Sequence, residues 1–161
     1  MAWRILIALL AIIGSTSSIA ADRYRVNLTR KDRNLYKIDG TAFLVQTQYC
    51  FVFGYGEEAV LTRYEVIFLQ DGDKCDVRRV LKETTVSAGT YEVRLTREDD
   101  NLYSTLDGTF VRTSLCLNLA LGEDSVLRMN GFGGGTVIFL DDGDKCDVEA
   151  IYSQVRFLAA Q

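Results

Sequence analysis

The sequence predicts an all-β protein made by tandem duplication of a roughly five-stranded antiparallel unit that a disulfide bond ties together. Segments 24–29 (YRVNLT) and 91–96 (YEVRLT) alternate apolar and polar residues with the period of two that is typical of half-buried strands. Residues 66–77 return at 137–148 with a single substitution. An internal repeat of this kind indicates that one supersecondary unit occurs twice.

The turn residues divide each copy into about five strands. Asp39-Gly40 and Asp107-Gly108 are typical of tight hairpin turns. In each copy we expect strands at the start of the repeat, before and after this hairpin, before the next Asp-Gly-Asp turn, and finally at 75–81 or 146–152. Short helical turns are expected only at 120–126 and 155–160. Two packed barrel-like or curled sheets are the favoured arrangement, and one merged ten-stranded sandwich is the alternative.

The chain divides into five segments. Residues 1–20 resemble a secretory signal, with Arg4 before an apolar run at 5–13 and small residues up to Ala20. The apolar run of about nine residues is short of the roughly 20 that span a bilayer, so no stable membrane span is expected after the signal is removed. The remaining segments are a first β repeat, a linker, a second β repeat and a C-terminal tail, at 21–82, 83–90, 91–154 and 155–161.

Four cysteines lie after the signal, two in each copy at matching positions. In an exported chain this number and distribution indicate disulfide bonds. Duplication favours pairing within each copy, because a unit that once folded alone had to close its own bridge. We therefore expect Cys50–Cys75 and Cys116–Cys146, in a secreted or periplasmic protein. A four-cysteine metal site is disfavoured by the absence of close cysteine pairs.

The repeated Asp-Gly-Asp-Lys-Cys-Asp motif is the one candidate metal site. Its carboxylates would suit calcium, although the EF-hand spacing fails and a hairpin turn explains the same residues. No other cofactor is expected. The candidate ligands are Asp71, Asp73, Asp76, Asp142, Asp144 and Asp147.

The first copy also contains an aromatic run in which alternation places Tyr49, Phe51, Phe53 and Tyr55 on one face. Such a face would stack on sugars or grip an apolar peptide. The second copy has leucine at all four equivalent positions, 115, 117, 119 and 121. A face that stays apolar but loses its aromatic rings favours a core, and a ligand platform confined to the first copy is the alternative.

Composition excludes several function classes. The chain has no histidine, which removes the common Ser-His and Cys-His catalytic pairs. Residues 22–83 hold 11 basic and 10 acidic residues (net +1), and residues 84–161 hold 6 and 12 (net −6). No basic stripe is present, so a nucleic-acid partner is not expected.

The predicted function is a non-catalytic binding or structural protein whose partner is a protein or cell-surface component. The alternatives are an inhibitor of an extracellular enzyme, inserting loop 54–58 or 130–135, and a small hydrolase acting through carboxylates.

The chain resembles a module in small exported bacterial proteins of uncharacterised function. The resemblance lies in Tyr49-Cys50, then residues 56–61 (GEEAVL), then Ile67-Phe68-Leu69 and Asp71 to Val77. The resemblance covers both copies. It implies an extracytoplasmic setting and brings no activity, cofactor or catalytic residue with it.

Overall fold

The computed structural model describes residues 22–156, which form twelve β-strands and no helix. The expected signal at 1–20 and most of the expected C-terminal tail lie outside these residues. Nothing in the described part forms a helix that could pass through a bilayer. The strands are β1 (Tyr24–Asp32), β2 (Leu35–Ile38), β3 (Phe43–Gln48), β4 (Glu57–Leu61), β5 (Glu65–Phe68), β6 (Lys74–Thr84), β7 (Gly89–Asp99), β8 (Leu102–Thr105), β9 (Thr109–Ser114), β10 (Leu121–Met129), β11 (Gly135–Phe139) and β12 (Lys145–Gln154).

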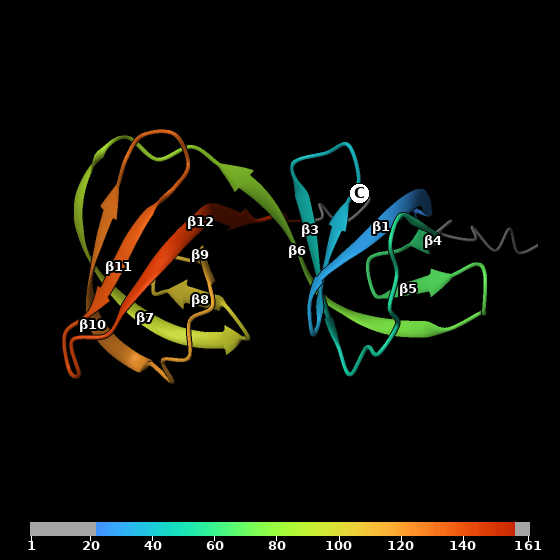
Figure 1. Ribbon diagram of the computed structural model, residues 1–161. Coiled ribbons are helices and arrows are strands. Elements are labelled where there is room, and N and C mark those ends of the chain that lie inside the picture. The colour runs from blue at the N-terminus through green and yellow to red at the C-terminus, as the bar shows by residue number, and fades with distance from the viewer. Residues whose placement is uncertain (1–21, 157–161) are drawn as a thin grey trace, which may run out of the picture.

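Each half of the chain closes into a six-stranded antiparallel barrel. In the first half the strands follow the order β5-β4-β1-β2-β3-β6, and pairing of β6 with β5 closes the ring. The second half has the equivalent order β11-β10-β7-β8-β9-β12, closed by β11 and β12. Figure 1 shows the two barrels side by side, with β6 and β12 running between them. Among residues 22–156, each of the twelve strands therefore has a paired strand on both sides.

Three details differ from the sequence-based expectation. Each half has six strands instead of five, because the segment before the Asp-Gly-Asp turn forms a hairpin of two strands, β4–β5 or β10–β11. The expected helical turn at 120–126 is wrong, since β10 occupies it. The linker is shorter than 83–90, because β6 continues to Thr84 and β7 begins at Gly89.

Each barrel has its own apolar core. Tyr36 and Phe68 pack in the first barrel with ring centroids 5.5 Å apart, and Tyr103 and Phe139 do so in the second at 5.3 Å. All four side chains are fully buried. The expected disulfides, Cys50–Cys75 and Cys116–Cys146, are both present and lie in these cores. Two disulfides are consistent with an oxidising extracellular or periplasmic environment.

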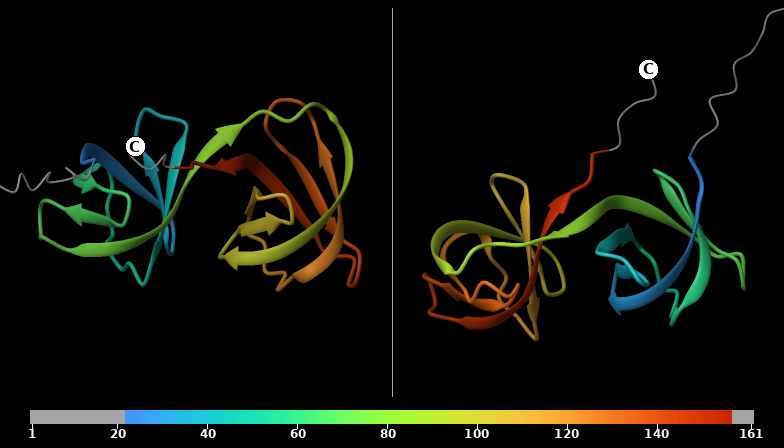
Figure 2. Two further views of the ribbon diagram at one scale, coloured as in Figure 1. Left: turned by 180° about the vertical axis from the view of Figure 1, so that it is seen from behind. Right: turned by 90° about the horizontal axis from the view of Figure 1, so that it is seen from above.

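The two barrels are joined by antiparallel pairing of β6 with β12. Lys82 pairs with Ser153, and these residues occupy equivalent positions, each seven residues after Cys75 or Cys146. The register therefore places a local two-fold axis through this pair. Figure 2 shows that this ribbon carries the chain from one barrel to the other. A third apolar cluster fills the junction and contains Leu35, Leu44, Leu81, Leu102, Phe110, Ala150 and Tyr152.

Candidate functional site

The most unusual surface consists of two crossover segments, which lead from β3 to β4 (residues 49–56) and from β9 into β10 (residues 115–121). Their large apolar side chains point outward, with 71–92% of each exposed. The preference for a core face is therefore wrong for both segments. The exposed residues are Tyr49, Phe51, Phe53 and Tyr55 in the first segment and Leu115, Leu117, Leu119 and Leu121 in the second.

Side chains alternate between two faces in these segments, as predicted. The face that points inward is the one that lies opposite the large apolar residues. Cys50 is completely buried and Val52 packs against the first core. The hydroxyl of Tyr36 donates to the Val52 carbonyl at 2.8 Å, and the Arg30 amide donates to the Gly54 carbonyl at 2.9 Å. The second segment is held in the same way, by Tyr103 to Asn118 (2.7 Å) and Arg97 to Ala120 (2.8 Å). Both segments are thus anchored from beneath while their apolar side chains face solvent.

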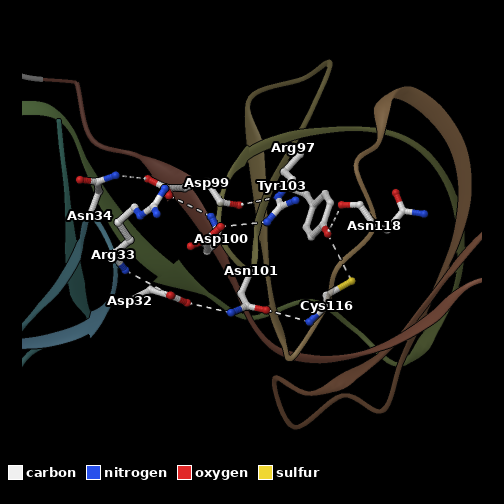
Figure 3. A network of polar contacts seen from close by, with 10 residues as sticks. All are labelled: Asp32, Arg33, Asn34, Arg97, Asp99, Asp100, Asn101, Tyr103, Cys116 and Asn118. Atoms are coloured by element: carbon white, nitrogen blue, oxygen red, sulfur yellow. Dashed lines mark hydrogen bonds and ion pairs between the residues drawn. The ribbon is translucent and has the colours of Figure 1, made fainter. Parts of the chain in front are cut away.

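Two asparagines connect the crossover segments to the junction between the barrels. Figure 3 shows both contacts of Asn101 and the contact of Asn34 with Asp99. Asn101 Nδ2 donates to Asp32 in the other barrel at 2.9 Å, while Asn101 Oδ1 accepts the Cys116 amide at 2.8 Å. The reciprocal contacts join Asn34 to Asp99 (3.1 Å) and to the Cys50 amide (3.3 Å). Each asparagine therefore fixes the disulfide cysteine of its own crossover segment and one aspartate of the opposite barrel.

The first residue of each crossover segment has a left-handed backbone. Tyr49 has φ 52° and Leu115 has φ 49°. Bulky side chains rarely adopt this conformation, and such strain is concentrated at functional sites. This backbone conformation occurs at the equivalent position in both halves. The outward orientation of the apolar side chains is therefore a property of the fold.

The first crossover segment forms one wall of a cleft. Phe51, Phe53 and Tyr55 are among its lining residues, and the guanidinium carbon of Arg30 lies 4.2 Å from the centroid of the Phe53 ring. The cleft has a volume of about 670 Å³. Its other lining residues include four carboxylates and no basic side chain, namely Glu57, Glu58, Asp71 and Asp73.

Glu57 is the most perturbed acid in this cleft. Its Oε1 atom is buried and has no hydrogen-bond partner. Desolvation raises the pKa of Glu57, and the nearby charges of Asp71 and Asp73 raise it further. The neighbouring Glu58 instead forms an ion pair with Arg25. Glu57 is thus a carboxylate without compensation at the wall of an open cleft, and sequence reasoning had placed it only in a loop.

The equivalent acid of the second half, Glu123, is compensated. Its Oε1 accepts the Asp141 amide at 3.1 Å. Asn118 Nδ2 donates to Asp142 Oδ2 at 2.9 Å, whereas the first half has Val52 at the equivalent position and cannot make this contact. In the second half, Glu123 and Asp142 therefore both have hydrogen-bond donors, whereas Oε1 of Glu57 in the first half has none.

The six aspartates proposed as calcium ligands do not converge. Within residues 22–156 no group of three or more acidic or cysteine side chains is placed to hold a metal ion. Asp71 and Asp73 lie in the β5–β6 turn, while Asp76 lies on β6 opposite Gln48 and Glu65. In the second copy Asp147 likewise lies on β12, and Asp142 Oδ1 accepts the Asp144 amide at 2.9 Å. Turn formation explains Asp142 and Asp144 without a metal.

No protein-family model, curated protein or solved structure matches this chain.

We expect Glu57→Gln to stabilise the protein slightly at neutral pH. Because the pKa of Glu57 is raised, the folded state binds more protons than the unfolded state between the ordinary pKa and the raised one, so stability falls as pH rises through that window. Glutamine cannot ionise and removes this loss. Urea unfolding should give a higher midpoint for the variant at about pH 7 and a smaller difference below about pH 4.

The neighbouring variant Glu58→Gln is the control for this experiment. It changes the net charge by the same amount but removes an exposed ion pair with Arg25, so it should bring no stabilisation. If the two variants had equal urea midpoints at both pH values, Glu57 would not be the carboxylate whose ionisation destabilises the fold.

Proposed function

We propose that this chain is an exported, non-catalytic binding protein that uses its two crossover segments to contact a protein partner outside the cytoplasm. The observation that carries the proposal is the exposure of four large apolar side chains at equivalent positions in both barrels. Exposed clusters of large apolar side chains mark interaction sites in soluble proteins. Tyrosine and phenylalanine supply much of the binding energy in such sites.

The side-chain chemistry shared by the two crossover segments favours a protein ligand over a sugar ligand. The first segment presents aromatic rings, which stack on sugars, but the second presents only leucines at the same positions. Leucine side chains pack against apolar protein side chains and do not provide a stacking face. A partner that contacts both segments therefore needs apolar side chains.

Rigidity of the segments also supports binding. Each segment is fixed by a disulfide, a tyrosine hydroxyl and an asparagine that reaches across the junction. A preorganised apolar surface loses little conformational entropy when a partner covers it. Holding apolar side chains in water in this way brings no stability to the protein itself.

Export and duplication are part of the same proposal. The signal-like residues 1–20 and the two disulfides together support an extracytoplasmic location. Duplication of a six-stranded unit is supported by the equivalent strand orders and by matched bulges, at Arg30/Asp32 in β1 and Arg97/Asp99 in β7.

Photo-cross-linking tests the proposed function. A photoreactive phenylalanine analogue is placed at Phe53 or Leu117, and the oxidised protein is incubated with extracytoplasmic proteins of its source. We expect a specific adduct at both positions. An excess of unlabelled wild type should prevent its formation, whereas an excess of the unlabelled Phe51→Ser/Phe53→Ser variant should not. The control position is Phe132 in the β10–β11 loop, which is 95% exposed and lies outside both segments. Adducts of equal strength at Phe132, or adducts that the serine variant displaces equally well, would refute the proposal.

A further inference from the structure

We propose that the cleft beside the first crossover segment receives a basic side chain, arginine or lysine, of the partner protein. This inference rests on the proposed function and adds the chemical class that the first barrel recognises. Aromatic residues and the carboxylate of Glu57, which has no donor for its Oε1, line the same cleft, whereas the second barrel has leucines and a hydrogen-bonded Glu123 at the equivalent positions.

The lining of the cleft is complementary to a cation. Phe51, Phe53 and Tyr55 are among its lining residues, and no lysine or arginine lines it. Of its four acids, Glu58 has an ion-pair partner in Arg25. A guanidinium or ammonium group between aromatic rings and carboxylates gains both cation–π attraction and charge-assisted hydrogen bonds. An anionic ligand would meet repulsion on the same surface.

Glu57 is the acceptor that most needs such a donor. Its buried Oε1 has no partner among the described residues, although buried carboxylate oxygens in proteins are normally hydrogen-bonded. Asp71 and Asp73 lie close enough to Glu57 to raise its pKa, so their charges act on the same point. A bound cation would offset all three charges at once.

Comparison of the two halves shows that the fold does not require this arrangement. In the second barrel Glu123 accepts the Asp141 amide and Asp142 accepts Asn118 Nδ2, so the equivalents of Glu57 and Asp71 both have internal donors. The same fold thus also occurs with internal hydrogen-bond donors for these acids. The first barrel instead keeps an acceptor open at a cost in stability, which is typical of binding sites.

Gly54 helps to keep the acceptor open. A Cβ atom at this position would lie 3.2 Å from both the Cβ and Oε2 atoms of Glu57 and 3.3 Å from the Leu28 carbonyl oxygen. The equivalent residue in the second barrel is Ala120, whose carbonyl accepts the Arg97 amide as that of Gly54 accepts the Arg30 amide. Glycine therefore leaves room for the Glu57 carboxylate at the position where the second barrel has the methyl group of Ala120.

The test is an NMR titration of the oxidised, ¹⁵N-labelled chain from residue 21 onward with three blocked peptides. Each peptide has the sequence Gly-Leu-X-Leu-Gly, where X is Arg, Gln or Glu. We expect the Arg peptide to shift the amide signals of residues 54–58 and 71–73 and to bind at least about tenfold more tightly than the Gln peptide, with the Glu peptide weaker still. Added salt should weaken only the Arg peptide.

Three variants identify the groups that recognise the cation. Glu57→Gln and Gly54→Ala should each weaken the Arg peptide about tenfold while leaving the Gln peptide unchanged. Asp73→Asn should weaken it less, and the matched variant Asp144→Asn, the same charge change in the second barrel, should have no effect. Because Glu57→Gln is expected to stabilise the fold, a loss of binding in this variant cannot be attributed to unfolding.

The outcomes separate this inference from the proposed function. Equal binding of the Arg and Gln peptides, abolished by Phe53→Ser, would overturn recognition of the cation and leave the role of the crossover segment intact. Arg-peptide binding that Glu57→Gln and Gly54→Ala do not change would also overturn it. Failure of all peptides, together with cross-linking that does not depend on the crossover segments, would overturn both proposals.

Discussion

Removal of either disulfide bond should lower the free energy of unfolding by about 3–4 kcal/mol and the melting temperature by about 10–20 °C. The bonds close loops with sequence separations of 25 and 30 residues. In the chain-entropy model, loops of this size account for the predicted loss because the reduced, unfolded chain has far more conformations. The measurement is a thermal melt of Cys50→Ala/Cys75→Ala and of Cys116→Ala/Cys146→Ala, each compared with the oxidised wild type.

The two double variants should lose similar stability. The longer second loop adds only about 0.2 kcal/mol of loop-closure free energy, which is below the precision of most unfolding experiments. Both cysteine pairs are also buried in the cores of their own barrels. An unchanged melting temperature in either variant would contradict the view that each barrel depends on its own bridge.

The strands and bridges were predictable because they follow from local and pairwise rules. Alternation of period two predicted β1 and β7, and the matched cysteines predicted the correct connectivity. The count of five strands per copy was wrong because the segment before the Asp-Gly-Asp turn contains a second hairpin. In the first copy Arg63 and Tyr64 form that turn without the glycine that usually marks one.

The crossover segments were misread for a different physical reason. Alternation shows that a segment has two faces, but it does not show which face is buried. The signal that decides the question was present in the same segment, since Cys50 lies opposite the aromatic residues. A disulfide cysteine belongs to the core, so its neighbours on either side had to face outward. The apolar residues on the exposed face therefore do not take part in packing of the barrel core.

The junction could not be predicted from the sequence at all. Leu35 and Leu102 follow the same pattern as other strand residues, and nothing in the chain distinguishes packing inside a barrel from packing between barrels. The asparagines also look like ordinary turn residues. Only the three-dimensional arrangement shows that Asn34 and Asn101 each contact the opposite barrel and their own crossover segment.

This junction should make the two barrels unfold as one unit, and Phe110→Ala should break that cooperation. Phe110 is 2% exposed in the junction cluster, and the Arg79 guanidinium from the first barrel lies 4.8 Å from its ring centroid. Truncation of a buried phenylalanine costs about 3–5 kcal/mol. It also removes the surface on which Arg79 rests, while leaving the disulfide and core of each barrel in place.

Differential scanning calorimetry measures the result. The wild type should show one transition, and Phe110→Ala should show an earlier melt that separates into two, because each barrel retains its own core. Phe132→Ala is the matched control, since the same truncation at a side chain that is 95% exposed should change nothing. One transition at the wild-type temperature in Phe110→Ala would contradict the view that the junction cluster couples the barrels. In that case the coupling would come from the contacts that the variant keeps, namely the β6–β12 pairing and the asparagine contacts of Asn34 and Asn101.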